Sequence, residues 1–250
     1  MPFAFRLITR NKCVSYVILR IKAAIIQKTH HMRGYKREFI ERALELGVLR
    51  FGEFTLKSGR VSPYFFNAGR FDTGYAAAKL ARCYAAAIAD LDTEFDVLFG
   101  PAYKGIPLVT LAAAALAEHH DLDFPFAYNR KEAKDHGEGG AIVGASVAGR
   151  KVLIVDDVIT AGTAIKEVAA LIRAAGGTPV GVLVALDREE VGNRARIPAK
   201  EQLEKEIGLT IMSIVSLTDF VDHLEQHEDY AAHLPAMKVY RNRYGVALDY

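Results

Sequence analysis

Two adjacent aspartates stand between an apolar run and a loop of small residues. The run 151–155 is followed by Asp156 and Asp157 and then by 158–164, with the sequence VITAGTA. A strand that leads through such a loop into a helix exposes the first backbone N–H groups of that helix, and these attract phosphate. Carboxylates repel phosphate, so the aspartates should face sugar hydroxyls or a shared Mg²⁺. The segment therefore predicts a site for a phosphorylated sugar.

A second anion site is indicated where another apolar run ends. Residues 100–105, with the sequence GPAYKG, follow the run 95–99 and offer backbone amides and Lys104 to an anion. The chain contains neither G-x-x-x-x-G-K-[ST] nor G-x-G-x-x-G. This argues against a nucleoside triphosphatase and against a dinucleotide-binding enzyme.

Charged residues and glycines fill 129–140, with the sequence NRKEAKDHGEGG. Such a segment is too polar for a core element and predicts a mobile loop. A loop of this kind can close over a polyanion and place cations where charge develops on a leaving group. A solvated charged run without a chemical role is the alternative interpretation.

Helices and strands are expected to alternate along the chain and so to position these segments. The sequence predicts helices at 33–44, 75–91, 104–119, 161–175, 218–226 and 235–243, and strands at 95–99, 124–128, 151–155, 178–186 and 209–216. Continuous apolar strands separated by helices indicate a parallel sheet covered on both faces. Ligands of such sheets bind beyond the carboxyl ends of the strands, which points to Gly100, Asp156 and Asp187.

Composition excludes several classes of protein. Of 250 residues, 51% are apolar and 25% charged, as in a globular domain. Residues 1–31 hold six basic residues and no acid, which leaves 26 basic and 30 acidic residues in 32–250. This acidic remainder argues against general attraction to nucleic acid. Two cysteines indicate a reducing compartment, the cytoplasm, and the absence of a long uninterrupted apolar run argues against a membrane span.

The division of the chain is expected to fall near Met32. Residues 1–31 lack the h-region and cleavage site of a signal peptide, and we interpret them as a mis-assigned start or a dispensable extension. A targeting segment, or an extension that lies on a membrane surface or a partner, are the alternatives. Residues 32–250 are expected to form a single domain.

Residues 151–164 resemble the phosphoribosyl diphosphate signature of the type I phosphoribosyltransferases: four apolar residues, two acids and a T-x-x-T loop. Residues 53–60 (EFTLKSGR), 62–67 (SPYFFN) and 129–140 resemble the orotate phosphoribosyltransferase family in its proteobacterial form, and the likeness runs from about Tyr35 to Val246. It implies an α/β fold with a mainly parallel sheet flanked by helices, a small hood region and a flexible catalytic loop. It also implies transfer of a phosphoribosyl group to orotate, which yields orotidine 5′-monophosphate and diphosphate in de novo pyrimidine (UMP) synthesis.

The resemblance assigns residues to each ligand. Those implied for 5-phosphoribosyl 1-diphosphate are Lys57, Tyr103, Lys104, Arg130, Lys131, Lys134, His136, Asp156, Asp157, Val158, Ile159, Thr160, Ala161, Gly162, Thr163 and Ala164. Catalytic roles are implied for Lys131, Lys134, His136, Asp156 and Asp157. In the family the loop reaches the neighbouring subunit's site, which implies a homodimer in which 129–140 acts in trans.

Orotate is expected to contact Phe65, Phe66, Thr160 and Arg188. A flat ring can stack on an aromatic face, and a guanidinium can pair with the carboxylate through two hydrogen bonds. Core packing is the alternative for the two phenylalanines. Mg²⁺ is the expected cofactor, bound mainly through the diphosphate substrate, with Asp156 and Asp157 as the candidate protein ligands.

Two other functions share part of this pattern. A purine phosphoribosyltransferase would share 156–164 but should lack Arg188 and the segments around Lys57 and Phe65. A regulatory phosphoribosyl-binding protein would sense a nucleotide and bind nucleic acid without turnover. The acidic body and the intact 129–140 segment weigh against it.

Overall fold

The computed structural model describes residues 32–56, 58–134, 140–159, 162–192 and 198–245, and for 131–134 the backbone alone. From Tyr35 onward the chain forms one compact unit. Among the described residues, no helix combines the length and the apolar character that crossing a membrane requires.

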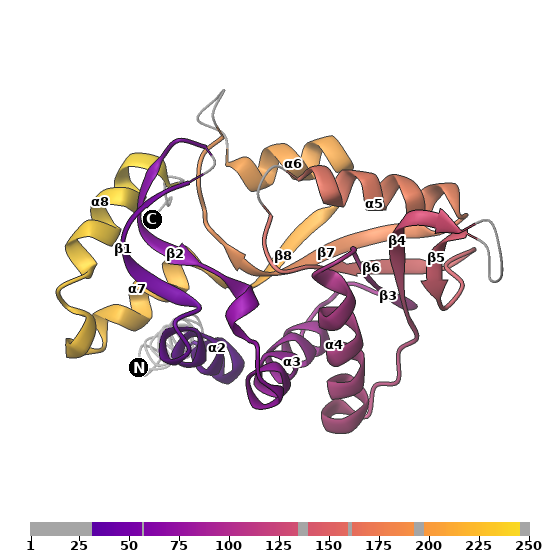
Figure 1. Ribbon diagram of the computed structural model, residues 1–250, viewed down its shortest axis with the longest axis horizontal. Coiled ribbons are helices and arrows are strands. Elements are labelled where there is room, and N and C mark those ends of the chain that lie inside the picture. The colour runs from indigo at the N-terminus through magenta and orange to yellow at the C-terminus, as the bar shows by residue number, and fades with distance from the viewer. Residues whose placement is uncertain (1–31, 57, 135–139, 160–161, 193–197, 246–250) are drawn as a thin grey trace, which may run out of the picture. The chain divides into compact units, whose positions relative to one another are not determined.

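A six-stranded sheet forms the middle of this unit, with the strand order β5–β4–β3–β6–β7–β8 (Figure 1). All neighbouring strands are parallel except β4 and β5. The strands are β3 (Val97–Gly100), β4 (Phe126–Lys134), β5 (Gly140–Gly144), β6 (Lys151–Val155), β7 (Thr178–Asp187) and β8 (Thr210–Ser216). The mainly parallel sheet expected from the sequence is confirmed.

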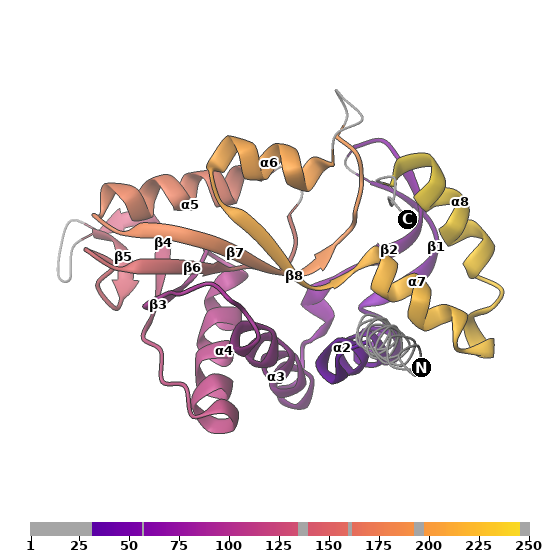
Figure 2. The same cartoon turned by 180° about the vertical axis from the view of Figure 1, so that it is seen from behind.

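Helices cover both faces of this sheet. The helices α3 (Gly74–Ala89) and α4 (Gly105–His120) lie on one face, and α5 (Thr163–Ala174) and α6 (Ala199–Ile207) lie on the other (Figures 1 and 2). Because side chains alternate along a strand, Phe99 and Ile154 pack with Ile172 of α5, while Leu98 and Leu153 are equally buried without belonging to that cluster. Covering on both faces explains why the central strands are continuous apolar runs.

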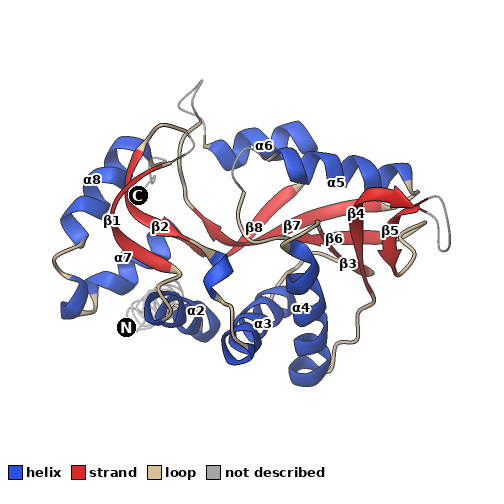
Figure 3. Ribbon diagram, in the orientation of Figure 1, coloured by secondary structure: helices blue, strands red, loops and turns tan. Residues whose placement is uncertain are grey.

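A second group of elements, which we call the hood, lies beside the β8 edge of the sheet (Figure 3). It contains an antiparallel pair of strands and three helices: β1 (Leu49–Thr55), β2 (Val61–Phe66), α2 (Gly34–Glu45), α7 (Leu217–Glu225) and α8 (Leu234–Tyr244). Short 3₁₀ helices, Ala68–Arg70 and Glu228–Tyr230, follow β2 and α7. In β2 the buried side chains alternate with half-buried ones.

The structure differs from the sequence prediction at 129–140. A loop was expected there, but β4 continues to Lys134 and β5 begins at Gly140, so these residues form an antiparallel arm with 135–139 outside the described part. The arm extends past β3, which pairs with β4 only as far as Tyr128. Residues of the arm therefore need no apolar character, and a strand without apolar residues is predicted from sequence as a loop. The helix α6 and the pair β1–β2 were not predicted as elements either.

Candidate active site

The chain changes direction across the sheet between β3 and β6. From β3 it passes through α4 to β4, and from β6 it passes through α5 to β7 on the other side. Loops after two such neighbouring strands diverge and leave a crevice at the carboxyl edge, where ligands of open α/β sheets bind. This topology places residues 101–104 beside residues 156–159.

The two aspartates lie at this point, and both are buried. Asp156 Oδ1 accepts a hydrogen bond from the backbone N–H of Asp157 at 2.9 Å, and Asp157 Oδ1 accepts one from the N–H of Val158 at 2.8 Å. The Tyr84 hydroxyl of α3 donates to the backbone carbonyl of Asp156 at 2.8 Å. The carboxylates are therefore held in fixed directions by the turn that follows β6.

Burial raises the pKa of Asp156 from 3.8 to about 6, and the charge of Asp157 beside it acts in the same direction. The N–H of Asp157 and the charge of Lys104 oppose this shift of the pKa. Two carboxylates at one turn repel each other and favour a proton on one of them. A ligand that brings hydroxyl donors or a cation to this turn would relieve that cost.

Lys104 comes from the neighbouring loop and pairs with the second aspartate. Its Nζ lies 2.6 Å from Asp157 Oδ2, and its side chain is 65% exposed whereas that of Asp157 is 9% exposed. Sequence reasoning assigns the lysine to an anion and the aspartate to a sugar. No pattern in the sequence indicates that the two side chains are in contact. Because the ammonium group stays largely in water, it can turn from Asp157 toward a phosphate at little cost.

Close packing of two glycines shapes this loop. A Cβ atom on Gly105 would lie 2.5 Å from Pro101 Cδ and 2.8 Å from the carbonyl carbon of Gly100. The loop is also tied to the arm, because the N–H of Ala102 donates to Asn129 Oδ1 at 2.8 Å. The peptide bond between Ala102 and Tyr103 is cis. Tyr103 and Lys104 are exposed at the surface.

Gly105→Ala is expected to lower the free energy of unfolding by about 1–3 kcal/mol, since the methyl group must displace the loop. We expect the KM for a phosphate substrate bound by this loop to rise as well. Urea unfolding and steady-state kinetics measure both. Gly74→Ala is the matched control, because Gly74 is also the first residue of a helix but has open space around it. Equal behaviour of the two variants would contradict the role of the glycine contact.

The start of α5 provides the other half of the site. Gly162 precedes this helix with a φ of 71°, and a Cβ there would lie 2.5 Å from Leu203 Cδ1. Only glycine suits both the left-handed backbone and that approach. Thr163 and Ala164 are exposed in the first turn, where helix geometry leaves backbone N–H groups without intrahelical partners. Val158 pairs with Leu186 beside β7, and Ile159 packs on the core.

Arg188 follows the end of β7 and reaches β2 of the hood. Its guanidinium lies 4.4 Å from the centre of the Tyr64 ring, and its Nε donates to Glu190 Oε1 at 2.7 Å. Phe66 shares the buried face of β2 with Tyr64 and stacks on Phe39, whereas Phe65 lies on the other face. The two phenylalanine side chains therefore cannot both line one face of a ligand ring.

Several expected site residues lie outside the described part of the structure. They are Lys57, His136, Thr160 and Ala161, together with the side chains of Lys131 and Lys134. Arg130 is described and is half-buried on β4. Sequence reasoning missed Tyr64, Glu190, Tyr240 and Arg60, which surround Arg188. No local pattern marks them, since they come from three separate segments: the start of β2, the turn after β7, and α8.

Among the described residues, no cluster of three or more His, Cys, Asp or Glu side chains could hold a metal ion. The Asp156 and Asp157 carboxylates offer oxygen donors at the turn after β6. A divalent cation there would need further oxygen ligands from a bound phosphate or sugar. Mg²⁺ commonly binds in this way, through one or two carboxylates and the phosphates of a substrate.

Comparisons with known proteins show the family of this chain. The family model described as phosphoribosyl transferase domain matches residues 70–218. The orotate phosphoribosyltransferase of Vibrio vulnificus (strain YJ016) is 59% identical over 215 residues, which are 86% of this chain and 100% of that protein. The enzyme of the same name from Pseudomonas putida (strain W619) gives the same identity and coverage.

Solved structures give the same result. The crystal structure of orotate phosphoribosyltransferase from Francisella tularensis matches with a TM-score of 0.75 and 41% identity, and covers 83% of this chain and 98% of that one. The Mycobacterium tuberculosis orotate phosphoribosyltransferase in complex with 5-phospho-α-D-ribosyl 1-diphosphate matches with a TM-score of 0.55 and 27% identity, over 74% of this chain and 98% of that one.

Proposed function

Because the chain belongs to the orotate phosphoribosyltransferases, we propose that its reaction takes place at the carboxyl ends of β3, β6 and β7. The enzyme transfers the 5-phosphoribosyl group from 5-phosphoribosyl 1-diphosphate to orotate in pyrimidine synthesis. A bond forms between the orotate nitrogen and C1′ of the ribose, and the bond from C1′ to diphosphate breaks. The observation that supports this placement best is the contact of Lys104 with Asp157 at the point where the sheet changes direction.

The 5′-phosphate is placed at the start of α5. The backbone N–H groups of this turn, with the hydroxyls of Thr160 and Thr163, provide hydrogen-bond donors for the phosphate oxygens. Gly162 lets the backbone approach the ligand closely. Residues 158–164 thus anchor the end of the ribose that does not react.

The ribose hydroxyls are assigned to Asp156 and Asp157. Carboxylates accept hydrogen bonds from hydroxyl groups, and their negative charge favours the positive charge that develops on the ribose as diphosphate leaves. Replacing water by ribose hydroxyls also compensates the burial that raises the pKa of Asp156. We assign the aspartates to holding and stabilising the sugar, and no residue to general acid or base catalysis.

The diphosphate is assigned to side chains of two segments, most of them cationic. Tyr103 and Lys104 belong to the loop after β3, and Arg130 begins the arm. Lys131, Lys134 and His136 continue that arm and are proposed to act in the site of the second subunit of a homodimer. Cations at a leaving diphosphate stabilise its developing charge, and such electrostatic stabilisation lowers the activation free energy of the transfer.

Mg²⁺ is proposed to enter with the diphosphate substrate. When bound it neutralises charge on the leaving group, and Asp156 and Asp157 are the side chains that could complete its shell. The donor set fits such an ion, because both side chains offer oxygen atoms at one turn.

Orotate is placed between β2 and the end of β7. Arg188 is proposed to pair with its carboxylate, while the main chain around Phe65 and Phe66 and the hydroxyl of Thr160 meet the polar edges of the ring. Since the two phenylalanine side chains lie on opposite faces of β2, only one of them can stack on the base.

We also propose that 32–250 forms a single phosphoribosyltransferase domain after an extension, 1–31, and that the enzyme works in the cytoplasm. Free Cys83 is buried in α3, which suits a reducing compartment.

Loss of orotate absorbance in the ultraviolet, after addition of phosphoribosyl diphosphate and Mg²⁺, tests the proposed site. Adenine, hypoxanthine and uracil serve as competing bases. We expect turnover of orotate alone, and a strong decrease of this turnover at a fixed orotate concentration when Arg188 or Lys104 is replaced by alanine. Turnover of a purine would be consistent with the proposed phosphate site but would contradict the assignment of orotate to Phe65, Phe66 and Arg188.

A further inference from the structure

A half-buried carboxylate, Glu190, lies between two arginines and a tyrosine where β7 meets the hood. Its Oε1 accepts hydrogen bonds from Arg188 Nε at 2.7 Å and from the Tyr240 hydroxyl at 2.9 Å. Its Oε2 accepts one from Arg60 Nη1 at 3.0 Å. The side chains of Arg60 and Glu190 are each 13% exposed. Both carboxylate oxygens are thus engaged away from bulk water, where charged hydrogen bonds are strongest.

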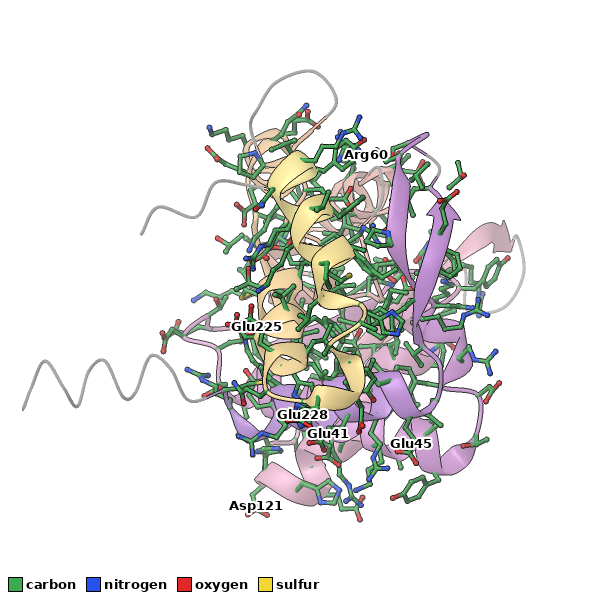
Figure 4. The ribbon with its side chains drawn as sticks, turned by 90° about the vertical axis from the view of Figure 1, so that its left-hand side faces the viewer. Glu41, Glu45, Arg60, Asp121, Glu225 and Glu228 are labelled. Carbon is green, nitrogen blue, oxygen red and sulfur yellow. The ribbon has the colours of Figure 1, made fainter. Side chains whose placement is uncertain are left out.

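Glu190 is itself held from the hood. Arg60 lies at the end of the β1–β2 pair beside α8 (Figure 4). Its Nη2 donates to the backbone carbonyl of Val191 at 2.7 Å, and its guanidinium lies 5.0 Å from the centre of the Tyr244 ring. The position of the carboxylate therefore depends on β2, α8 and the end of β7 together.

The backbone on either side of Arg188 is fixed as well. Asp187 Oδ1 accepts the N–H of Glu189 at 2.8 Å, and Glu189 has a φ of 49°. Glu189 Oε2 accepts the N–H and the hydroxyl of Thr218 at the start of α7, at 2.8 and 2.6 Å. The turn Asp187–Glu190 is thereby anchored to α7, and the Arg188 side chain takes its direction from its contacts with Glu190 and Tyr64.

Arg60 and Arg188 carry two positive charges against the single negative charge of Glu190. The other two carboxylates of the turn have their own partners, because Asp187 pairs with Lys200 and Glu189 accepts from Thr218. Glu190 accepts the hydrogen bond of Arg188 Nε. Arg188 Nη2 has only long contacts, at 3.4 Å to Ser62 Oγ and 3.5 Å to the Tyr240 hydroxyl. The terminal nitrogens of the guanidinium are the part left for an anionic ligand.

We propose that Glu190 is a positioning residue, which holds the guanidinium of Arg188 so that its terminal nitrogens meet the carboxylate of the pyrimidine base. Selectivity for a carboxylated base over uracil then depends on Glu190 as well as on Arg188. The inference rests on the proposed placement of orotate at Arg188.

A double-mutant cycle with Arg188→Ala and Glu190→Ala tests it. Glu190→Ala is expected to raise the KM for orotate about tenfold or more, since it removes a charged hydrogen bond that orients Arg188. Its KM for phosphoribosyl diphosphate and its inhibition by uracil should stay within about twofold of the parent, as neither ligand offers a carboxylate to Arg188. In the Arg188→Ala background the second change should add little, because residues that act through each other are not additive.

Three further variants keep the test decisive. Glu190→Gln retains an oxygen that can accept from Arg188 Nε, and we expect it to recover part of the orotate affinity. Arg60→Met removes one support of Glu190 and serves if Glu190→Ala does not fold, with a smaller rise of the same KM expected. Glu38→Ala is the control, since it breaks the 3.0 Å ion pair with Lys79 between α2 and α3.

The outcomes separate the inference from the assignment beneath it. If Arg188→Ala raises the KM for orotate and Glu190→Ala leaves it unchanged, Glu190 has no positioning role and the site stands. If Glu190→Ala changes the KM for orotate, the KM for phosphoribosyl diphosphate and the inhibition constant of uracil equally, Glu190 has a structural role only and the inference is overturned. If Arg188→Ala leaves the KM for orotate unchanged, the placement of orotate at Arg188 and the positioning role of Glu190 are both wrong.

Discussion

Asp156→Asn is expected to remove most of the turnover and at the same time to stabilise the fold at neutral pH. The carboxylate is assigned to the ribose, on which positive charge develops, and loss of one such interaction typically costs about 10²–10³-fold in kcat. Stability should move the other way, because burial raises the pKa of Asp156 to about 6 and the ionised side chain is costly in the free enzyme.

The sign follows from the two pKa values. Asp156 has an ordinary pKa of 3.8 in the unfolded chain and about 6 in the folded one, so between these values the folded state binds more protons. Its contribution to the free energy of unfolding therefore falls as pH rises from about 4 to about 6, and the cost at pH 7 is about 2–3 kcal/mol. Asparagine carries no charge and should lack this cost.

Urea unfolding at pH 5 and pH 7.5, with kcat measured in parallel, checks both effects. Asp157→Asn is the matched comparison, since it removes the neighbouring carboxylate but also the ion pair with Lys104. We expect it to lose turnover without the gain in stability. If Asp156→Asn is less stable than the parent at pH 7.5, the buried charge is compensated in the free enzyme and the account of Asp156 is wrong.

The strand, turn and helix that we assign to the phosphate and the ribose could be predicted from sequence because they follow one another in the chain. A buried strand, two acids, a small-residue turn and a helix follow one another within 151–175, and the structure has them in that order. Alternation of apolar strands with helices also predicts the sheet and the edge where ligands bind. In these segments the hydrophobic pattern and the turn residues agree.

The base half depends on contacts between distant segments, and the sequence shows them poorly. Arg188 meets Tyr64 from β2, Tyr240 from α8 and Glu190 from its own turn. No periodicity connects these positions. The arm formed by β4 and β5 was misread as a loop for a related reason, since strands outside the core keep backbone pairing while losing the apolar side chains that identify a strand.

Mixing two inactive variants is expected to restore activity if 129–140 acts in the partner's site. Lys134→Ala should lower kcat strongly by removing a cation from the leaving diphosphate, and Arg188→Ala should prevent productive binding of orotate. Lys134 ends β4 of the arm, which lies at the far end of the sheet from the hood (Figures 1 and 2). Three strand spacings, about 14 Å, also separate β4 from β7, which carries Arg188.

Statistics give the size of the recovery. After exchange at equal concentrations, about half of the dimers contain one subunit of each kind, and with trans action each has one intact site and one doubly defective site, so activity should reach about a quarter of the parent. If each site uses its own arm, every site in the mixed dimer keeps one defect and no activity returns.

A second pair of variants makes this result specific. Lys104→Ala mixed with Arg188→Ala should give no recovery, because both residues belong to the same subunit's crevice and each site of the mixed dimer keeps a defect. Exchange is verified by a mass difference between the two subunits. Recovery with both pairs would indicate reassembly effects unrelated to the arm. Recovery only with the pair Lys134→Ala and Arg188→Ala requires that one subunit supplies the cations at the diphosphate while the other holds the ribose and the base.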